Sequence, residues 1–313
     1  MQVFDVVIIG GGPGGVSAAI YASRKLLKTV LVSKDIGGQV LLAGYIENYA
    51  GYEGRVGLGL ADIFERQLNE FGVQVVTDSV KNVEKVGDVF KIICDENELM
   101  SRTIIATGGS SYRRLNVPGE DAYFGNGVSA CATCDAPMAR NKIAVVVGGG
   151  NAALQSAELL ARFATKVYII HRRDHFRADG ILIERIKKLD NVEPILNTMV
   201  KEVKGSRKVE GVILKDTVSG AEIELHAQKV FVEIGRDVKL DYMKHLVKTN
   251  ERGQVIVNKA QKTSCEGIFA AGDITDLVYG QAIIAAGQGA VAALSAYDYL
   301  VEKGLDKSYA QFP

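Results

Sequence analysis

Short apolar runs alternate with helix-like segments along this chain of 313 residues. The first run, Asp5 to Ile9, ends in glycines, and an alanine-rich segment follows it as far as about Leu27. A second run, Thr29 to Val32, comes next. Continuous apolar runs of this length are typical of buried parallel strands. The pattern therefore predicts a strand, a tight turn, a helix and a second strand, which together form a βαβ unit.

The same pattern returns in the middle of the chain. Lys142 to Val147 is an apolar run that ends in glycines, Asn151 to about Phe163 has the composition of a helix, and Lys166 to Ile170 is a further run. No short repeat period is visible, which argues against a solenoid. The sequence thus predicts two related folding units, each built around a parallel sheet.

Two connectors divide the chain, at Arg113 to Gly119 and at Gly235 to Lys239. We expect a discontinuous first domain, residues 1–113 and 239–313, with a second domain, residues 114–238, inserted into it. The expected class is α/β, with two Rossmann-like, three-layer dinucleotide-binding domains (ββα/βαβ). Further strands are expected at 90–94, 102–106, 230–234 and 267–271, and a long helix at 281–299.

Charge and hydropathy narrow the possible functions. The chain has 37 Lys and Arg against 37 Asp and Glu, so its formal net charge is zero. This balance argues against binding to nucleic acid or to an anionic membrane. The N-terminal segment lacks the basic region of a secretory signal, and the longest apolar stretch, Ala282 to Leu294, is interrupted and too short to span a bilayer. We expect a cytoplasmic protein.

Gly10, Gly12 and Gly15 form the pattern GxGxxG directly between a predicted strand and a predicted helix. The first glycine permits a tight turn, the second lets the backbone approach a pyrophosphate, and the third lets helix and strand pack closely. The acidic residue that usually binds the ribose, about 20 residues further on, is missing. This strand ends at Ser33 and Lys34. The turn predicts a dinucleotide site, and the alternative is a plain tight turn.

Gly148, Gly150 and Ala153 give the related pattern GxGxxA in the second unit. The position at which an NAD site carries an acid is occupied here by a basic cluster. Guanidinium groups fit a 2′-phosphate, whereas a carboxylate fits the 2′-hydroxyl of NAD. The second site is therefore predicted to bind NADPH, and the alternative is a solvated basic loop. The basic cluster consists of His171, Arg172, Arg173 and Arg177.

Cys131 and Cys134 form a CxxC pair followed by Asp135, inside the expected second domain. Two thiols at this spacing can close a disulfide, and a neighbouring carboxyl group can exchange protons with them. One alternative is a zinc site with His171 and His175, but these histidines lie far from the cysteines along the chain, and we expect no metal. The other alternative is two buried apolar thiols.

Two nucleotide sites and a dithiol belong together chemically. NADPH delivers a hydride, whereas a disulfide takes two electrons and protons at sulfur, and a flavin reacts with both. The first glycine turn is therefore predicted to bind FAD. Electrons would pass from NADPH to the flavin, then to Cys131 and Cys134, and then to an external disulfide. Because the expected flavin and dithiol lie on different domains, we expect the inserted domain to swing on its connectors.

The motifs GGGPGG, CATCD and HRRDHFRA occur together in this chain, which resembles the low-molecular-weight thioredoxin reductases along essentially its whole length. The resemblance implies that Cys134 lies against the flavin, that Cys131 attacks the partner's disulfide, and that Asp135 is the acid or base. It also implies a homodimer and a thioredoxin or thioredoxin/glutaredoxin-like partner. With the first glycine turn, the expected FAD set is Gly10, Gly12, Pro13, Gly15, Ser33, Gly38, Gln39, Asn48, Ala106, Thr107, Gly108, Gly272, Asp273, Gln281 and Ala282. The expected NADPH set is Gly148, Gly150, Asn151, Ala153, His171, Arg172, Arg173 and Arg177.

The chain departs from that family at two places. Ala136 stands where the family usually has glycine, and Gly280 stands where it usually has arginine. Segments such as NVPGED and VSGAEIEL resemble the flavoprotein component of alkyl hydroperoxide reductase, which usually takes NADH. A flavoprotein reductase that serves a peroxiredoxin system, or another acceptor such as ferredoxin or a quinone, is the alternative function.

Overall fold

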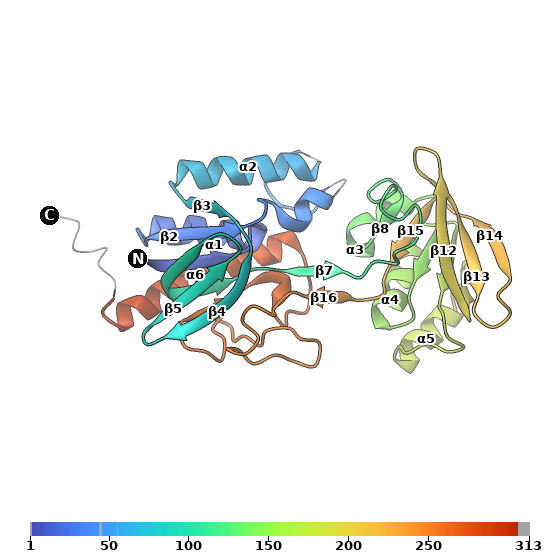
Figure 1. The fold of residues 1–313 in the computed structure, drawn as a ribbon. Coiled ribbons are helices and arrows are strands. Elements are labelled where there is room, and N and C mark those ends of the chain that lie inside the picture. Colours follow the sequence, from blue (N-terminus) through green and yellow to red (C-terminus); the bar gives the residue numbers. More distant parts are fainter. Residues whose placement is uncertain (1, 44–45, 55, 306–313) are drawn as a thin grey trace. The chain divides into compact units, whose positions relative to one another are not determined.

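The computed structural model describes residues 2–43, 46–54 and 56–305, and the chain divides into two compact units. Unit 1 comprises Met1–Ser111 and Asp237–Pro313, and unit 2 comprises Tyr112–Arg236 (Figure 1). Each unit contains a parallel sheet with helices against it. The predicted α/β class with two Rossmann-like sheets is confirmed.

The sheet of unit 1 has the strand order β3-β2-β1-β6-β5-β4, and β17 pairs with β6. The strands β3, β2, β1, β6 and β17 are parallel, whereas β4 and β5 form an antiparallel extension. The strands are β1 (Val3–Ile9), β2 (Thr29–Ser33), β3 (Gln74–Thr77), β4 (Val80–Val86), β5 (Val89–Cys94), β6 (Glu98–Ala106) and β17 (Ile268–Ala270). The helices are α1 (Pro13–Arg24), α2 (Gly57–Glu70) and α6 (Ala282–Glu302), with 3-10 turns η1 (Gly38–Leu42) and η3 (Gly272–Ile274).

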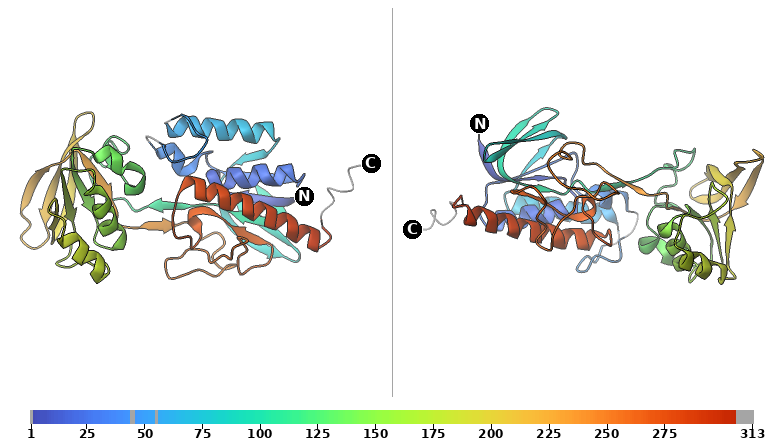
Figure 2. Two further views of the ribbon diagram at one scale, coloured as in Figure 1. Left: turned by 180° about the vertical axis from the view of Figure 1, so that it is seen from behind. Right: turned by 90° about the horizontal axis from the view of Figure 1, so that it is seen from below.

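Alternate residues of these strands supply two cores in unit 1. Val6 and Ile8 face the helices α1, α2 and α6, whereas Val7 and Ile9 face the opposite side. The alternation follows from the pleat of a strand. Figure 2 shows α6 lying alongside α1. Small residues permit this approach, because a Cβ on Gly289 would lie 1.9 Å from the carbonyl oxygen of Gly14.

Unit 2 has a five-stranded parallel sheet of order β11-β10-β9-β15-β8, and a separate antiparallel sheet of order β12-β13-β14. The parallel strands are β8 (Val128–Ser129), β9 (Ile143–Val147), β10 (Lys166–Ile170), β11 (Val192–Ile195) and β15 (Lys229–Val232). The antiparallel strands are β12 (Thr198–Gly205), β13 (Val209–Asp216) and β14 (Glu222–His226). The helices are α3 (Ala132–Asp135), α4 (Asn151–Leu160) and α5 (Gly180–Lys187), with a 3-10 turn η2 (Ala136–Ala139).

The three layers of unit 2 are held by two cores. Val146 and Phe231 pack with the helices α3, α4 and α5, whereas Val145 and Val230 pack against the antiparallel sheet. The parallel sheet is therefore covered on both faces, which explains why its strands are continuous apolar runs in the sequence. Its carboxyl-terminal edge carries the second glycine turn.

The chain passes between the units twice, at β7 (Ser110–Tyr112) and β16 (Arg236–Val238), and these two strands pair with each other. The N–H of Arg113 donates to the carbonyl of Gly235 at 3.0 Å. The buried carboxylate of Glu120 then accepts the N–H groups of Leu115 and Asn116 at 2.9 and 2.8 Å. The first predicted connector is thus tied into unit 2 beyond Arg113.

Some elements differ from expectation. Helix α1 ends at Arg24 rather than near Leu27, because Leu26 adopts a positive φ of 59°, and α4 ends at Leu160 rather than near Phe163. Helix α2 and the antiparallel sheet of unit 2 were not predicted. Within the described residues, no helix is both long and apolar enough to cross a membrane.

Candidate active site: two glycine turns and a redox pair

The first glycine turn joins β1 to α1 and has one crowded side and one open side. A Cβ on Gly10, whose φ is +113°, would lie 2.5 Å from the carbonyl oxygen of Thr107, and a Cβ on Gly15 would lie 1.8 Å from that of Gly10. A Cβ on Gly12 would meet no atom within 4 Å. The first and third glycines therefore serve packing, while the second leaves space at the N-terminus of α1. This arrangement fits a bound pyrophosphate.

Side chains from neighbouring strands hold this turn in place. The Oγ of Ser33, at the end of β2, accepts the N–H of Gly11 at 2.9 Å. The hydroxyl of Thr107, just after Ala106 of β6, donates to the carbonyl of Ile9 at 2.9 Å. Pro13 occupies the first turn of α1, where its missing N–H costs nothing.

Four other predicted FAD residues of unit 1 meet in small hydrogen-bonded groups. Gln39 donates to the carbonyl of Ser110 at 2.6 Å and to Asp273 at 3.5 Å. Asn48 donates to Gln281 at 3.0 Å. Gln281 is the N-cap of α6, so Ala282 is the first residue of that helix.

Two glycines pack closely near these groups, Gly38 against the first turn and Gly272 against α6. A Cβ on Gly38 would lie 3.3 Å from the Cα of Gly12, and Gly272, with φ +78°, faces Ala285 of α6. The phenol of Tyr242, which sequence reasoning did not identify, has a buried oxygen with no hydrogen-bond partner among the described residues, and that oxygen would lie 3.3 Å from a Cβ on Gly108. Burial raises the pKa of Tyr242 above its ordinary value.

The second glycine turn joins β9 to α4 and repeats the same geometry. A Cβ on Gly148, with φ +152°, would lie 2.3 Å from the carbonyl oxygen of Glu233 and 2.8 Å from the Cβ of Ala153. A Cβ on Gly150 would meet no atom within 4 Å. Asn151, the first residue of α4, donates to Asp179 at 2.9 Å. The open face at Gly150 fits a second bound pyrophosphate.

The basic cluster follows β10, beside this turn. Arg172 and Arg177 are exposed and Arg173 is partly exposed, and the N–H of Arg177 donates to the carbonyl of Gly149 at 2.7 Å. His171 differs, because its ring is buried directly against Gly149 and its Nε2 has no partner among the described residues. Burial lowers the pKa of His171. The arginine side chains are thus open to solvent beside the turn, whereas His171 is packed against it.

Cys131 and Cys134 form a disulfide at the start of α3 in unit 2. Cys131 is the N-cap of this short helix, and its Sγ accepts the N–H of Cys134 at 3.2 Å. The N–H of Cys131 donates to the hydroxyl of Ser129 at 3.1 Å. Cys131 is half-buried and Cys134 is exposed. The disulfide fits a redox-active centre and is not the pair of buried thiols considered as an alternative.

Asp135 lies at the other end of α3, in a setting suited to proton transfer. Burial raises the pKa of its carboxyl group, while a hydrogen bond from Ser129 and the charge of Lys229 oppose that shift. Burial and the nearby Lys142 in turn lower the pKa of Lys229. A carboxyl group whose pKa is moved toward neutrality exchanges protons more readily at physiological pH. Ser129 and Lys229 were not predicted, because nothing in their local sequence distinguishes them.

The two other cysteines have no comparable setting. Cys94 is buried at the end of β5, and burial with the nearby charges of Asp78 and Asp95 raises its pKa to about 11. Burial also raises the pKa of Cys265. Neither thiol is poised to form a thiolate at neutral pH.

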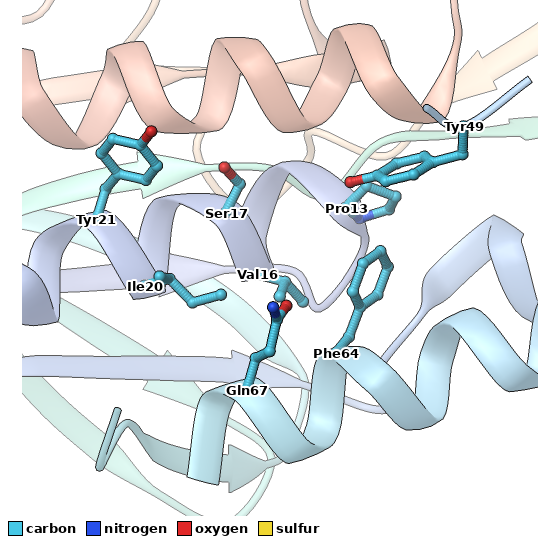
Figure 3. A pocket seen from close by; sticks show the side chains of 8 residues that line it. All are labelled: Pro13, Val16, Ser17, Ile20, Tyr21, Tyr49, Phe64 and Gln67. Carbon is cyan, nitrogen blue, oxygen red and sulfur yellow. The ribbon is translucent and has the colours of Figure 1, made fainter. Parts of the chain in front are cut away.

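A separate cavity of about 110 Å³ lies between α1 and α2, close to Pro13 (Figure 3). Tyr49, Phe64 and Gln67 form part of its lining. Small-molecule pockets usually measure about 300–1,000 Å³. This cavity is too small for a dinucleotide, so the glycine turns remain the candidate nucleotide sites.

Two glycine turns and a reducible disulfide define a dinucleotide-dependent oxidoreductase, and comparison with known proteins agrees. The family model described as pyridine nucleotide-disulphide oxidoreductase matches residues 4–289. The thioredoxin reductase of Mycolicibacterium smegmatis is 41% identical over 304 residues, which cover 96% of this chain and 98% of that protein. The crystal structure of thioredoxin reductase from Streptococcus pyogenes MGAS5005 has a TM-score of 0.92 at 36% identity, covering 96% of this chain and 99% of the other.

A different relative has a longer chain. An alkyl hydroperoxide reductase component of Staphylococcus aureus (strain MRSA252) is 35% identical over 302 residues, which cover 96% of this chain but 60% of that protein. The chain belongs to the pyridine nucleotide-disulphide oxidoreductase family and, within it, to the thioredoxin reductases. Its cofactors are FAD and NADPH.

The open face of the first turn leads to a specific prediction. Gly12 has φ −72°, which any residue adopts, and its Cβ position is free. Gly12→Ala should therefore fold normally but bind FAD roughly tenfold more weakly or worse, because the methyl group occupies the space of the pyrophosphate. Flavin absorbance per chain after purification, and titration of the apoprotein with FAD, measure the effect.

Gly287→Ala is the matched control, since Gly287 lies exposed on α6 with nothing near its Cβ position. It should retain full flavin content. Undiminished FAD affinity in Gly12→Ala would remove the first turn from the flavin site.

Proposed function

We propose that this protein reduces the disulfide of thioredoxin, or of a thioredoxin/glutaredoxin-like protein, with electrons that pass from NADPH through FAD to Cys131 and Cys134. One observation carries the proposal. The partly exposed disulfide of α3 lies in unit 2, the unit that also contains the second glycine turn and Arg172, Arg173 and Arg177. The thioredoxin reductases among its relatives support the choice of partner.

Unit 1 is proposed to bind FAD at the turn of Gly10, Gly12 and Gly15, and unit 2 to bind NADPH at the turn of Gly148 and Gly150. Bound FAD supplies the ability to take a hydride from NADPH and to reduce a disulfide. Arg172, Arg173 and Arg177 would bind the 2′-phosphate through charge-assisted hydrogen bonds.

In the reduced protein, the thiolate of Cys131 attacks one sulfur of the partner's disulfide. The partner's S–S bond breaks, its second sulfur leaves, and a mixed disulfide forms. Cys134 then attacks Cys131, which restores the Cys131–Cys134 disulfide and releases the partner as a dithiol. Asp135 is proposed to accept and return the protons that these steps transfer, and Cys134 is the thiol on the flavin side.

The unit carrying the dithiol would serve both the flavin and the partner by swinging between them. The paired strands β7 and β16 are the proposed hinge, because Glu120 already holds the residues beyond Arg113. We also propose that the protein is a cytoplasmic homodimer. A cytoplasmic setting supplies the reducing conditions in which a lone CxxC pair functions as a redox centre rather than as a structural staple.

A second candidate is a flavoprotein reductase that serves a peroxiredoxin system. The similarity to the alkyl hydroperoxide reductase component of Staphylococcus aureus favours it. The two functions share the chemistry at sulfur and differ in the protein that docks at Cys131.

Both candidate functions are tested by measuring the oxidation of NADPH, at the nicotinamide absorbance, with a panel of acceptors. Thioredoxin should accelerate NADPH consumption far above the rate with protein alone, and two free thiols should appear for each NADPH consumed. A glutaredoxin-like protein or a peroxiredoxin replaces thioredoxin in parallel assays. Rapid turnover with a quinone or ferredoxin, and none with any protein disulfide, would contradict the proposal.

A further inference from the structure

One ionisable side chain next to the redox pair has no part in the function above. Glu233 follows β15 and is half-buried, in a stretch that is otherwise apolar, VFVEIG. Its backbone N–H continues the pairing with β9 by donating to Val147 at 2.8 Å. Its carboxylate accepts the hydroxyl of Ser156, on α4, at 2.9 Å. The backbone N–H of Ala132, on α3, also binds it.

Glu233 therefore joins the dithiol helix to the nucleotide-binding helix. Ala132 directly follows Cys131, so the carboxylate lies one peptide unit from that cysteine. Lys229, Phe231 and Glu233 share one face of the strand, because strand residues alternate in direction. Phe231 packs in one core with Ala132 at the start of α3, and Lys229 acts on Asp135 at its end.

The charge at this position matters for the chemistry of the pair. When the disulfide takes up two electrons, its S–S bond breaks. The two sulfurs then gain either two protons, giving two thiols, or one proton, giving a thiol and a thiolate. A nearby carboxylate repels a thiolate and favours the fully protonated product. The thiolate is also the form that small oxidants attack.

Other groups act on the Glu233 carboxyl. Burial raises its pKa, while the hydrogen bonds from Ser156 and Ala132 and the charge of Arg236 favour the ionised form. Asp135 and Lys229 lie at the other end of α3, and Lys142 acts on Lys229.

We propose that Glu233 is a positioning residue of the redox pair: its carboxylate, held between α3 and α4, disfavours the Cys131 thiolate in the reduced protein. The reduced pair thereby carries less of the thiolate, which is the form that small oxidants attack. This role rests on the proposed function in so far as Cys131 and Cys134 are the working redox pair.

The test measures Cys131 directly, in a Cys134→Ser background where it is the single thiol of the pair. The rate of alkylation of Cys131 by iodoacetamide is followed by peptide mass spectrometry from pH 5 to pH 10. Glu233→Gln keeps an oxygen that accepts from Ser156 but removes the charge. It should increase the alkylation rate at pH 7 about threefold or more and move the pH midpoint downward.

Further variants separate charge from packing. Glu233→Asp keeps the charge and should retain the parent profile. Ser156→Ala should shift the profile in the same direction as Glu233→Gln, but less, because it removes one bond that favours the ionised carboxyl. Glu158→Gln removes a carboxylate elsewhere on α4, the helix that carries Ser156. It should leave the alkylation profile of Cys131 unchanged.

A Glu233→Gln profile that superimposes on the parent profile would overturn the proposal. So would an equal shift in Glu233→Asp, which would indicate packing alone, or in Glu158→Gln. The alkylation assay needs neither NADPH nor thioredoxin, so its failure leaves the proposed function standing. Conversely, a protein that failed to reduce thioredoxin with NADPH would still give an interpretable alkylation rate for Cys131.

Discussion

Cys131→Ser should lose NADPH-dependent reduction of the protein disulfide by roughly a thousandfold or more, which is the scale seen when a nucleophile is removed. Serine keeps the size of the side chain, but its hydroxyl does not ionise near neutral pH. The N-cap position of residue 131 also suits serine, so α3 should form normally. Reduction of the bound flavin by NADPH, measured by stopped-flow absorbance, should persist because it does not involve this sulfur.

Cys265→Ser is the control for this experiment. Burial raises the pKa of the Cys265 thiol, and it lies in unit 1, away from the redox pair along the chain. Its replacement should leave the rate of disulfide reduction nearly unchanged. If Cys131→Ser reduced the protein disulfide at the parent rate, electrons would leave by another route, and the dithiol would be dispensable.

The double variant Arg172→Ala/Arg173→Ala should lose its preference for NADPH. Hydrogen bonds to a charged group contribute about 1.5–3 kcal/mol each, and about 1.4 kcal/mol corresponds to a factor of ten. Loss of two such bonds predicts a fall of about a hundredfold or more in kcat/KM for NADPH. NADH has no 2′-phosphate, so its kcat/KM should stay within about threefold. Steady-state kinetics with each nucleotide provide the comparison.

Arg207→Ala offers a matched loss of positive charge, since Arg207 is exposed in unit 2 between β12 and β13. It should affect neither nucleotide. Equal losses with NADPH and NADH in the double variant would contradict the assignment of the arginines to the phosphate.

Local sequence was sufficient to predict the two glycine turns and the disulfide. Gly10 and Gly148 require backbone angles that favour glycine, and each is flanked by an apolar run and a helix. A signal of this kind is contained in about 30 neighbouring residues, the length of a βαβ unit. The CxxC spacing is likewise local, because the two cysteines occupy one helical turn.

The rest of the fold and of the candidate site depends on contacts between segments that are far apart in the sequence. The antiparallel sheet of unit 2 covers a face of the parallel sheet, and no local motif shows which face it covers. His171 is one of four nearby basic residues, yet the fold buries it against Gly149 and leaves Arg172 exposed. Glu233 was overlooked because its partners, Ser156 and Ala132, come from two other helices. Its one visible signal was a carboxylate in an apolar strand segment.

The pairing of Arg113 with Gly235 brings the two ends of unit 2 side by side. A segment whose two ends are adjacent can be removed from its host, or transferred to another, without stretching either chain. The nucleotide-binding and dithiol functions proposed for residues 112–236 therefore form a transferable module, which evolution or an engineer could insert into any loop whose ends lie one strand spacing apart.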